Sequence, residues 1–183
     1  MSDSILKLYH GSYCVVQTPD LSMCRPGKDF GVGFYLTTSR EQAVRFTKTS
    51  IMKAQKDWRI GDSAIGFVSE FAFDPKETML DMKEFPAADS EWLHCVASYR
   101  KKGLISSAPW DGFDFVIGKI ANDRTNLVIT GYLDGVYGEP GSGRADEIAI
   151  SLLEPEKLKD QYCFRTQKAL ETLVYAGSER IIL

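Results

Sequence analysis

The sequence lacks most features that mark secreted and membrane-spanning proteins. It has no Cys-X-X-Cys pair, and its four cysteines are scattered along the chain (Cys14, Cys24, Cys95 and Cys163). Cysteines spaced this way are typical of reduced thiols in the cytoplasm. No apolar run is long enough to cross a bilayer, and residues 1–4 lack the basic start of a signal peptide. We therefore expect a cytoplasmic protein.

Metal ligands at a useful spacing are also scarce. His94 and Cys95 are neighbours, but no further ligand types follow them at the intervals that metal sites use. We expect both residues to be structural and the protein to need no metal.

The chain has no net positive charge. It carries 22 Lys and Arg against 25 Asp and Glu, which gives a net charge of −3. This balance argues against a strongly cationic nucleic-acid binder but leaves room for a local basic patch.

What is present is ordinary for a globular protein. The chain has 183 residues, of which 44% are hydrophobic and 26% are charged, and it shows no internal repeat or long linker. This predicts one domain, residues 1–183, with a sizeable core. Segments typical of strands and of helices mix without regular alternation, so the predicted fold class is α+β.

The chain is organised around residues 29–39, Asp-Phe-Gly-Val-Gly-Phe-Tyr-Leu-Thr-Thr-Ser. Two glycines precede a predicted strand over 34–37, which holds Tyr35. Thr38 with Glu41 three residues later forms a capping-box pattern, so a helix should start there. Such a corner can form one wall of a ligand cleft. The alternative is a plain glycine turn before a core strand.

The predicted helix runs from about residue 39 to 57 and has two faces. Its core face is expected to hold Ala43, Val44, Ile51, Ala54 and Trp58. Its opposite face is basic and carries Arg45, Lys48, Lys53, Lys56 and Arg59. That face is either a docking surface for an anionic acceptor or a solvated helix face.

The remaining elements follow from hydrophobic periodicity and turn signals. Predicted strands cover 67–73, 78–80, 114–118, 161–166 and 181–183. Predicted helices cover 90–102, the helical spacing of 145–152, and a short segment around 169–173. A polar pair, Asn122 and Asp123, is either a loop cap or part of a site.

Three short motifs occur in an informative order. They are Tyr9-His10-Gly11-Ser12, the segment 29–37, and Gln161-X-X-Phe164-X-Thr166. Together they resemble the ADP-ribosyltransferase superfamily, and within it a small bacterial family with the same His-Tyr-Gln pattern. The resemblance implies two small, mainly antiparallel sheets around an NAD cleft, with flanking helices.

The resemblance also implies a role for each site residue, with NAD as co-substrate. His10 would bond a ribose hydroxyl, and the main chain of Gly11 would hold the nicotinamide carboxamide. Tyr35 would stack on the nicotinamide ring. Phe46 would form the other wall, and Ser12 would support the adenosine side.

Gln161 departs from the glutamate that many active members carry. Glutamine can orient the ribose 2′-hydroxyl but supplies no negative charge. Losing one such electrostatic contact typically costs about 10²–10³ in rate. We therefore expect single transfer rather than chain elongation. We also expect Gln161 to share a cleft with His10 and Tyr35, and Gln161→Glu to keep or raise NAD cleavage.

Three functions remain open at this point. The first is a mono-ADP-ribosyltransferase acting on a protein or nucleic-acid acceptor, which the resemblance implies to be a toxin neutralised by a small antitoxin protein. The second is a non-catalytic module that binds NAD or ADP-ribose. The third is an NAD-dependent RNA 2′-phosphotransferase, which would need several basic residues lining its cleft.

Overall fold

A computed structural model of the chain describes residues 5–62, 64–76, 78–101, 109–120, 123–153 and 159–183. The chain divides into two compact units, which we describe separately. The first contains Met1–Asp20, Tyr35–Met79 and Gln167–Leu183, and the second contains Leu21–Phe34 and Leu80–Thr166. The single domain expected over 1–183 stays a prediction.

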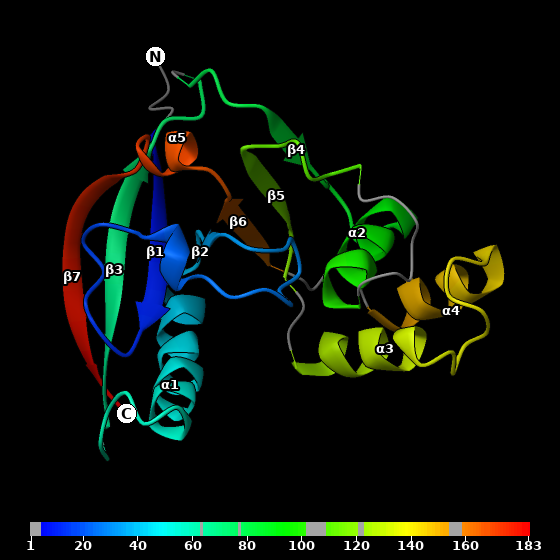
Figure 1. The fold of residues 1–183 in the computed structure, drawn as a ribbon, viewed down its shortest axis with the longest axis horizontal. Coiled ribbons are helices and arrows are strands. Elements are labelled where there is room, and N and C mark those ends of the chain that lie inside the picture. The colour runs from blue at the N-terminus through cyan, green and yellow to red at the C-terminus, as the bar shows by residue number, and fades with distance from the viewer. Residues whose placement is uncertain (1–4, 63, 77, 102–108, 121–122, 154–158) are drawn as a thin grey trace. The chain divides into compact units, whose positions relative to one another are not determined.

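The first unit is built on a three-stranded sheet. Its strands are β1 (Leu6–Ser12), β3 (Ile65–Phe73) and β7 (Val174–Ile182), in the order β1-β3-β7. Both pairings are antiparallel, and the strands lie side by side in Figure 1. The predicted strand at the C-terminus is therefore correct in kind, but it begins well before Ile181.

Register and burial place the core of this sheet. In the β1–β3 ladder Leu8 lies opposite Phe71, and His10 lies opposite Ser69. Leu8, Phe71 and Ser69 are fully buried. Because side chains alternate along a strand, His10 shares a face with Leu8, whereas Gly11 faces the other way.

Helix α1 (Arg40–Lys56) packs on the sheet and confirms the long predicted helix. Its N-cap is Ser39, whose Oγ accepts a hydrogen bond from the Gln42 amide at 3.4 Å. The capping box predicted at Thr38 is therefore wrong. The chain is still extended just before the cap, because Thr37 is bonded to Tyr9 through both of its main-chain polar groups.

The core face of α1 differs from the prediction at its end. Ala43, Ile51 and Ala54 are buried as expected. Trp58 is 94% exposed and adopts a positive φ of 58°. The helix has already ended at Lys56, so helical spacing no longer places Trp58 on the core face.

The described residues of the second unit form a sheet, three α-helices and a short 3-10 helix, Leu21–Met23. The four-stranded sheet has the order β2-β6-β5-β4. Its strands are β2 (Phe34–Leu36), through which the chain passes into the first unit, β4 (Met82–Glu84), β5 (Phe115–Lys119) and β6 (Asp160–Phe164). β4 runs parallel to β5, and β5 runs antiparallel to β6.

The helices of this unit are α2 (Ser90–Arg100), α3 (Asp123–Leu133) and α4 (Gly143–Leu153). Two expectations were wrong here. The short strand predicted over 78–80 lies instead at Met82–Glu84, and α3 was not anticipated as a helix. The helix predicted over 90–102 is α2, which ends at Arg100, and residue 102 lies outside the described residues. A further short helix, α5 (Gln167–Leu170), belongs to the first unit.

Aromatic side chains form the core of the second unit. Trp92 on α2 is fully buried, and its Nε1 donates to the Lys119 carbonyl at 3.1 Å. Phe30 and Phe85 stack with their ring centroids 5.8 Å apart. A Cβ added to Gly118 would lie 2.6 Å from the Phe30 ring, so β5 can approach this cluster only with glycine there.

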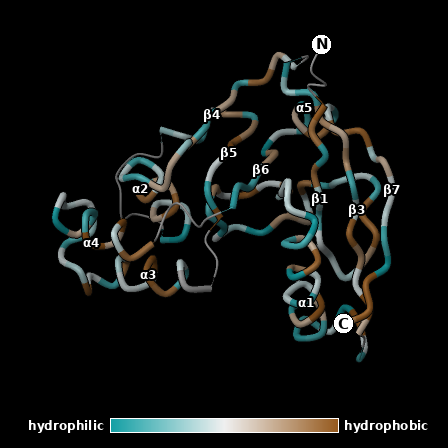
Figure 2. The backbone as a smooth tube through the Cα atoms, turned by 180° about the vertical axis from the view of Figure 1, so that it is seen from behind, coloured by the Kyte–Doolittle hydropathy of each residue, from teal (hydrophilic) through white to brown (hydrophobic). Residues whose placement is uncertain are grey.

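The observed class is therefore α+β, with two mostly antiparallel sheets, as predicted. The backbone coloured by hydropathy in Figure 2 shows apolar stretches along the strands of both sheets. No helix among the described residues is both long and apolar enough to span a membrane.

Candidate functional site

Five of the six predicted site residues belong to the first unit, where β1 meets the segment after β2. The Tyr9 amide donates to the Thr37 carbonyl at 2.8 Å, and the Thr37 amide donates back at 3.0 Å. This antiparallel bridge fixes the segment containing Tyr35 beside the segment containing His10. The structure thus brings these two predicted residues together.

A direct hydrogen bond joins them. His10 Nδ1 lies 2.8 Å from the main-chain oxygen of Tyr35. A carbonyl can only accept, so Nδ1 carries the proton, and in the neutral ring Nε2 is then an acceptor. The bond therefore fixes both the tautomer and the orientation of the imidazole. An acceptor nitrogen is what a ribose hydroxyl needs as a partner.

Gly11 has a packing role that the sequence did not reveal. A Cβ added there would lie 1.9 Å from the Ala43 carbonyl oxygen and 3.2 Å from the Thr47 amide nitrogen. Helix α1 therefore approaches β1 so closely that only glycine fits. The glycine is explained by structure whether or not a ligand binds.

The main chain of Gly11 faces the outer edge of the sheet. Tyr9 directs its amide and carbonyl to Thr37, away from β3. Main-chain groups two residues apart in a strand point the same way, so those of Gly11 face this edge too. Gly11 is buried at this edge, beside the bridge to Thr37, and its contact with a ligand stays a prediction.

No hydrogen bond between described residues links the other two predicted site residues of the first unit, Ser12 and Phe46, to His10 or Tyr35. Ser12 is buried, with Oγ 3.9 Å from the Cys14 sulfur. Phe46 is 47% exposed on α1, and this helix packs against the Gly11 face of β1, opposite His10. The proposed role of Phe46 as a second wall stays a prediction.

Gln161 belongs to the second unit, where it is the second residue of β6 and only 8% exposed. Its Nε2 donates to Asp29 Oδ2 at 2.8 Å and to the Lys119 carbonyl at 3.2 Å. The start of a strand is where it was predicted to lie. That it shares a cleft with His10 and Tyr35 stays a prediction.

Sequence reasoning missed the group that holds Gln161. Asp29 is 8% exposed, and its Oδ1 accepts from Arg100 Nε at 3.0 Å. Asp29 opens the organising motif, so its position was a usable signal. Arg100 lies 71 residues away on α2, and no local pattern links it to Asp29.

Two cavities are lined by other residues. One of about 470 Å³ in the second unit is lined partly by Gly31, Tyr99 and Arg165, and the Arg165 guanidinium lies 5.2 Å from the Tyr99 ring centroid. The other, of about 210 Å³ in the first unit, is lined partly by Arg40 and Glu179, which form an ion pair. The described residues that line them include none of the six predicted site residues.

Cys95 is buried on α2, and its neighbour His94 is partly exposed and contacts a residue of α4. His94 Nε2 lies 2.7 Å from Asp146 Oδ2, and the Tyr132 hydroxyl donates to Asp146 Oδ1 at 2.6 Å. Burial, followed by the bond to Asp146, raises the pKa of Tyr132, and burial also raises the pKa of the Cys95 thiol. A buried, protonated thiol is a poor nucleophile. Of the polar pair 122–123, Asn122 lies outside the described residues.

Fold and site together define an α+β protein in which a histidine within strand β1 is bonded to the main chain of a tyrosine on β2. The chain belongs to the family described as Protein of unknown function (DUF3990), which it matches over residues 6–175. A search of curated proteins and a search of solved structures each returned no match.

Proposed function

We propose that the protein is a mono-ADP-ribosyltransferase that cleaves NAD and transfers ADP-ribose to a macromolecular acceptor. The observation that carries the proposal is the 2.8 Å hydrogen bond from His10 Nδ1 to the Tyr35 main chain. It supports the proposal because it sets an acceptor nitrogen, a tyrosine and the outward main chain of Gly11 in one place.

The chemistry would proceed by loss of nicotinamide. The bond from ribose C1′ to the nicotinamide nitrogen breaks, its electron pair stays on that nitrogen, and the ring leaves neutral. The ribose becomes oxocarbenium-like, and an acceptor nucleophile then bonds C1′ and gives up its proton. Tyr35 would stack on the cationic ring before it leaves, and His10 would hold a ribose hydroxyl.

Gln161 has a limited part in this proposal. Both hydrogen bonds of its amide nitrogen go to protein acceptors, so its carbonyl oxygen is the atom offered to a ligand. An amide oxygen can accept from the ribose 2′-hydroxyl but brings no full negative charge to the oxocarbenium ion. This supports slow single transfer more than chain elongation.

The neutral amide of Gln161 favours one alternative function, a module that binds NAD or ADP-ribose without turnover. A neutral amide can orient a bound ribose as well as it can assist a reaction. The two functions differ in one measurable product, free nicotinamide.

The test is to incubate the protein with NAD labelled in the adenylate part, with and without cell extract. We expect nicotinamide release, and label on a macromolecule only when extract is present. Tyr35→Ala should abolish release, whereas Tyr35→Phe keeps the ring and should retain most of it. Bound NAD with no nicotinamide release would establish the binding module instead.

The acceptor and any neutralising partner are part of the same proposal. Treating the labelled extract separately with protease and nuclease tells a protein acceptor from a nucleic acid. A small antitoxin protein would be recognised by its recovery with the chain and by loss of release when it is added.

A further inference from the structure

The amide of Gln161 is held in one orientation by two acceptors. Asp29 Oδ2 and the Lys119 carbonyl both lie within hydrogen-bond distance of Nε2, at 2.8 and 3.2 Å. An amide nitrogen has two N–H donors, and here each has an acceptor. Turning the amide over would set its oxygen against two oxygens, so the orientation is fixed.

Asp29 is itself anchored. Arg100 donates to Asp29 Oδ1 from Nε at 3.0 Å and from Nη2 at 2.5 Å, and its Nη1 bonds Asn126. Both side chains are largely buried. The ion pair with Arg100 uses Oδ1, while Oδ2 accepts from Gln161. Arg100 therefore holds the carboxylate in the orientation that Gln161 needs.

The second acceptor is fixed as well. The Lys119 carbonyl also accepts from the indole nitrogen of Trp92, which is fully buried. The acceptor therefore belongs to the rigid core of the second unit.

We propose that Asp29 is a positioning residue for Gln161: together with the Lys119 carbonyl it accepts both N–H donors of the amide, so that only the amide oxygen meets the ligand. This inference rests on the proposed function. Gln161 then accepts a hydrogen bond from a substrate hydroxyl and donates none. Asp29 acts through Gln161 and touches no reacting atom.

The geometry changes the expectation for Gln161→Glu. A glutamate there would direct a carboxylate oxygen at Asp29 Oδ2, where Gln161 now donates at 2.8 Å. Two buried like charges at that distance are destabilising. We therefore expect this variant to lose stability and activity, in place of the retained activity that the sequence predicts.

The test is a swap of the two groups. In Asp29→Asn the carboxylate that accepts from Gln161 Nε2 becomes a neutral amide, so the Lys119 carbonyl alone still holds the Gln161 amide and its orientation is less firmly fixed. In Gln161→Glu two carboxylates face each other. In the double variant the hydrogen bond between the two side chains is restored with its direction reversed, because the new amide at position 29 donates to the new carboxylate at position 161. An oxygen of that carboxylate then faces outward. Recovery should be partial, because this carboxylate still lies against the Lys119 carbonyl.

The expected results are as follows. Asp29→Asn should lower kcat for nicotinamide release about tenfold, with KM for NAD changed less than about twofold. Gln161→Glu should lower the melting temperature by about 5–10 °C. The double variant should regain at least half of that loss and release nicotinamide faster than either single variant.

An exposed pair of the same chemistry serves as the control. Gln55 Nε2 donates to Asp62 Oδ1 at 3.3 Å on the surface of the first unit. Gln55→Glu, Asp62→Asn and their combination should shift the melting temperature by less than about 2 °C, because water screens the charges. They should leave nicotinamide release unchanged.

The outcomes separate the two proposals. If the wild-type protein releases no nicotinamide, the proposed function fails, while the melting temperatures still test the pairing of Asp29 and Gln161. If the wild type is active but the double variant shows only the summed losses of the single variants, the positioning role is overturned.

A proton NMR spectrum of the wild-type protein tests the inference if a variant does not fold. The Gln161 side-chain amide, assigned in the wild type by its absence from Gln161→Ala, should show two separated proton signals that exchange slowly with water. Signals like those of a free glutamine would overturn the inference.

Discussion

At the residue scale, Gly11 is the clearest point at which packing and the proposed site coincide. Its missing side chain admits α1, since an added Cβ would meet the Ala43 carbonyl at 1.9 Å. Its main chain faces the outer edge of β1. One residue thus admits the helix and directs its main-chain groups to the edge of β1 at which the proposed ligand would bind.

Gly11→Ala should lower the free energy of unfolding by about 2–4 kcal/mol, because β1 or α1 must move to admit the methyl group. Denaturant titration measures this. Gly61→Ala is the matched control, because an added Cβ there meets no described atom within 4 Å. Equal effects of the two substitutions would contradict the close approach of α1 to β1.

The sequence indicates some residues of the candidate site but not the contacts between distant ones, for a physical reason. His10, Gly11 and Tyr35 lie in short motifs whose local pattern carries information. Asp29 and Gln161 are 132 positions apart, and their hydrogen bond depends on how distant segments pack. A single sequence shows which residues carry suitable groups but not which distant pairs meet.

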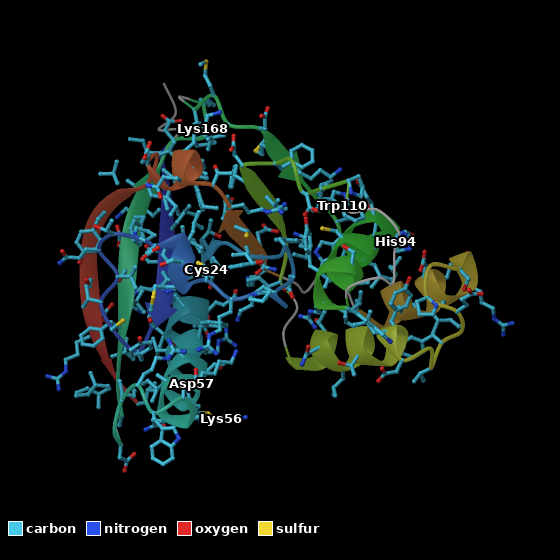
Figure 3. The ribbon with its side chains drawn as sticks, in the orientation of Figure 1. Cys24, Lys56, Asp57, His94, Trp110 and Lys168 are labelled. Atoms are coloured by element: carbon cyan, nitrogen blue, oxygen red, sulfur yellow. The ribbon has the colours of Figure 1, made fainter. Side chains whose placement is uncertain are left out.

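At the element scale, α1 carries the basic face predicted from the sequence, with some of its charge neutralised. Arg45 pairs with Glu41 at 3.1 Å, and Arg59 pairs with Asp57 at 2.6 Å. Lys48, Lys53 and Lys56 are exposed. Figure 3 shows Lys56 and Asp57 at the C-terminal end of the helix. These three lysines are the cations through which the face would attract an anionic acceptor.

Replacing Lys48, Lys53 and Lys56 by Gln should slow transfer to the macromolecular acceptor about tenfold at low salt and leave nicotinamide release intact. The control changes Lys7, Lys76 and Lys168 to Gln, which removes the same charge elsewhere on the first unit. Transfer lowered equally by both sets would mean that only net charge matters. No effect of the first set would leave α1 as a solvated helix.

Most elements were predicted near their observed positions, including the short strands β2, β5 and β6, but β4 and α3 were not. The apolar spacing of α1 and the aromatic run of β3 are strong local signals. α3 was missed because it begins in a polar stretch, at Asp123, and β4 was displaced because three residues carry little periodicity. The end of α1 explains the exposed Trp58: periodicity does not show where a helix stops.

At the scale of the whole molecule, the proposed function predicts linkage between NAD binding and stability. A ligand that binds only the native state adds RT ln(1 + [L]/Kd), about 2.7 kcal/mol at a hundred times Kd. We expect millimolar NAD to raise the melting temperature by several degrees, and Tyr35→Ala to remove this shift. A melting curve unchanged by both NAD and ADP-ribose would contradict the proposed function.

The sheet of the first unit takes one strand from each of three separate chain segments. β1 comes from Met1–Asp20, β3 from Tyr35–Met79 and β7 from Gln167–Leu183. During synthesis on the ribosome β1 and β3 can pair early, but one edge of β3 has no native partner until β7 emerges. An open strand edge is a template for pairing with another chain. The nascent protein is therefore exposed to association for most of its translation, and neither unit can be produced alone as one continuous fragment.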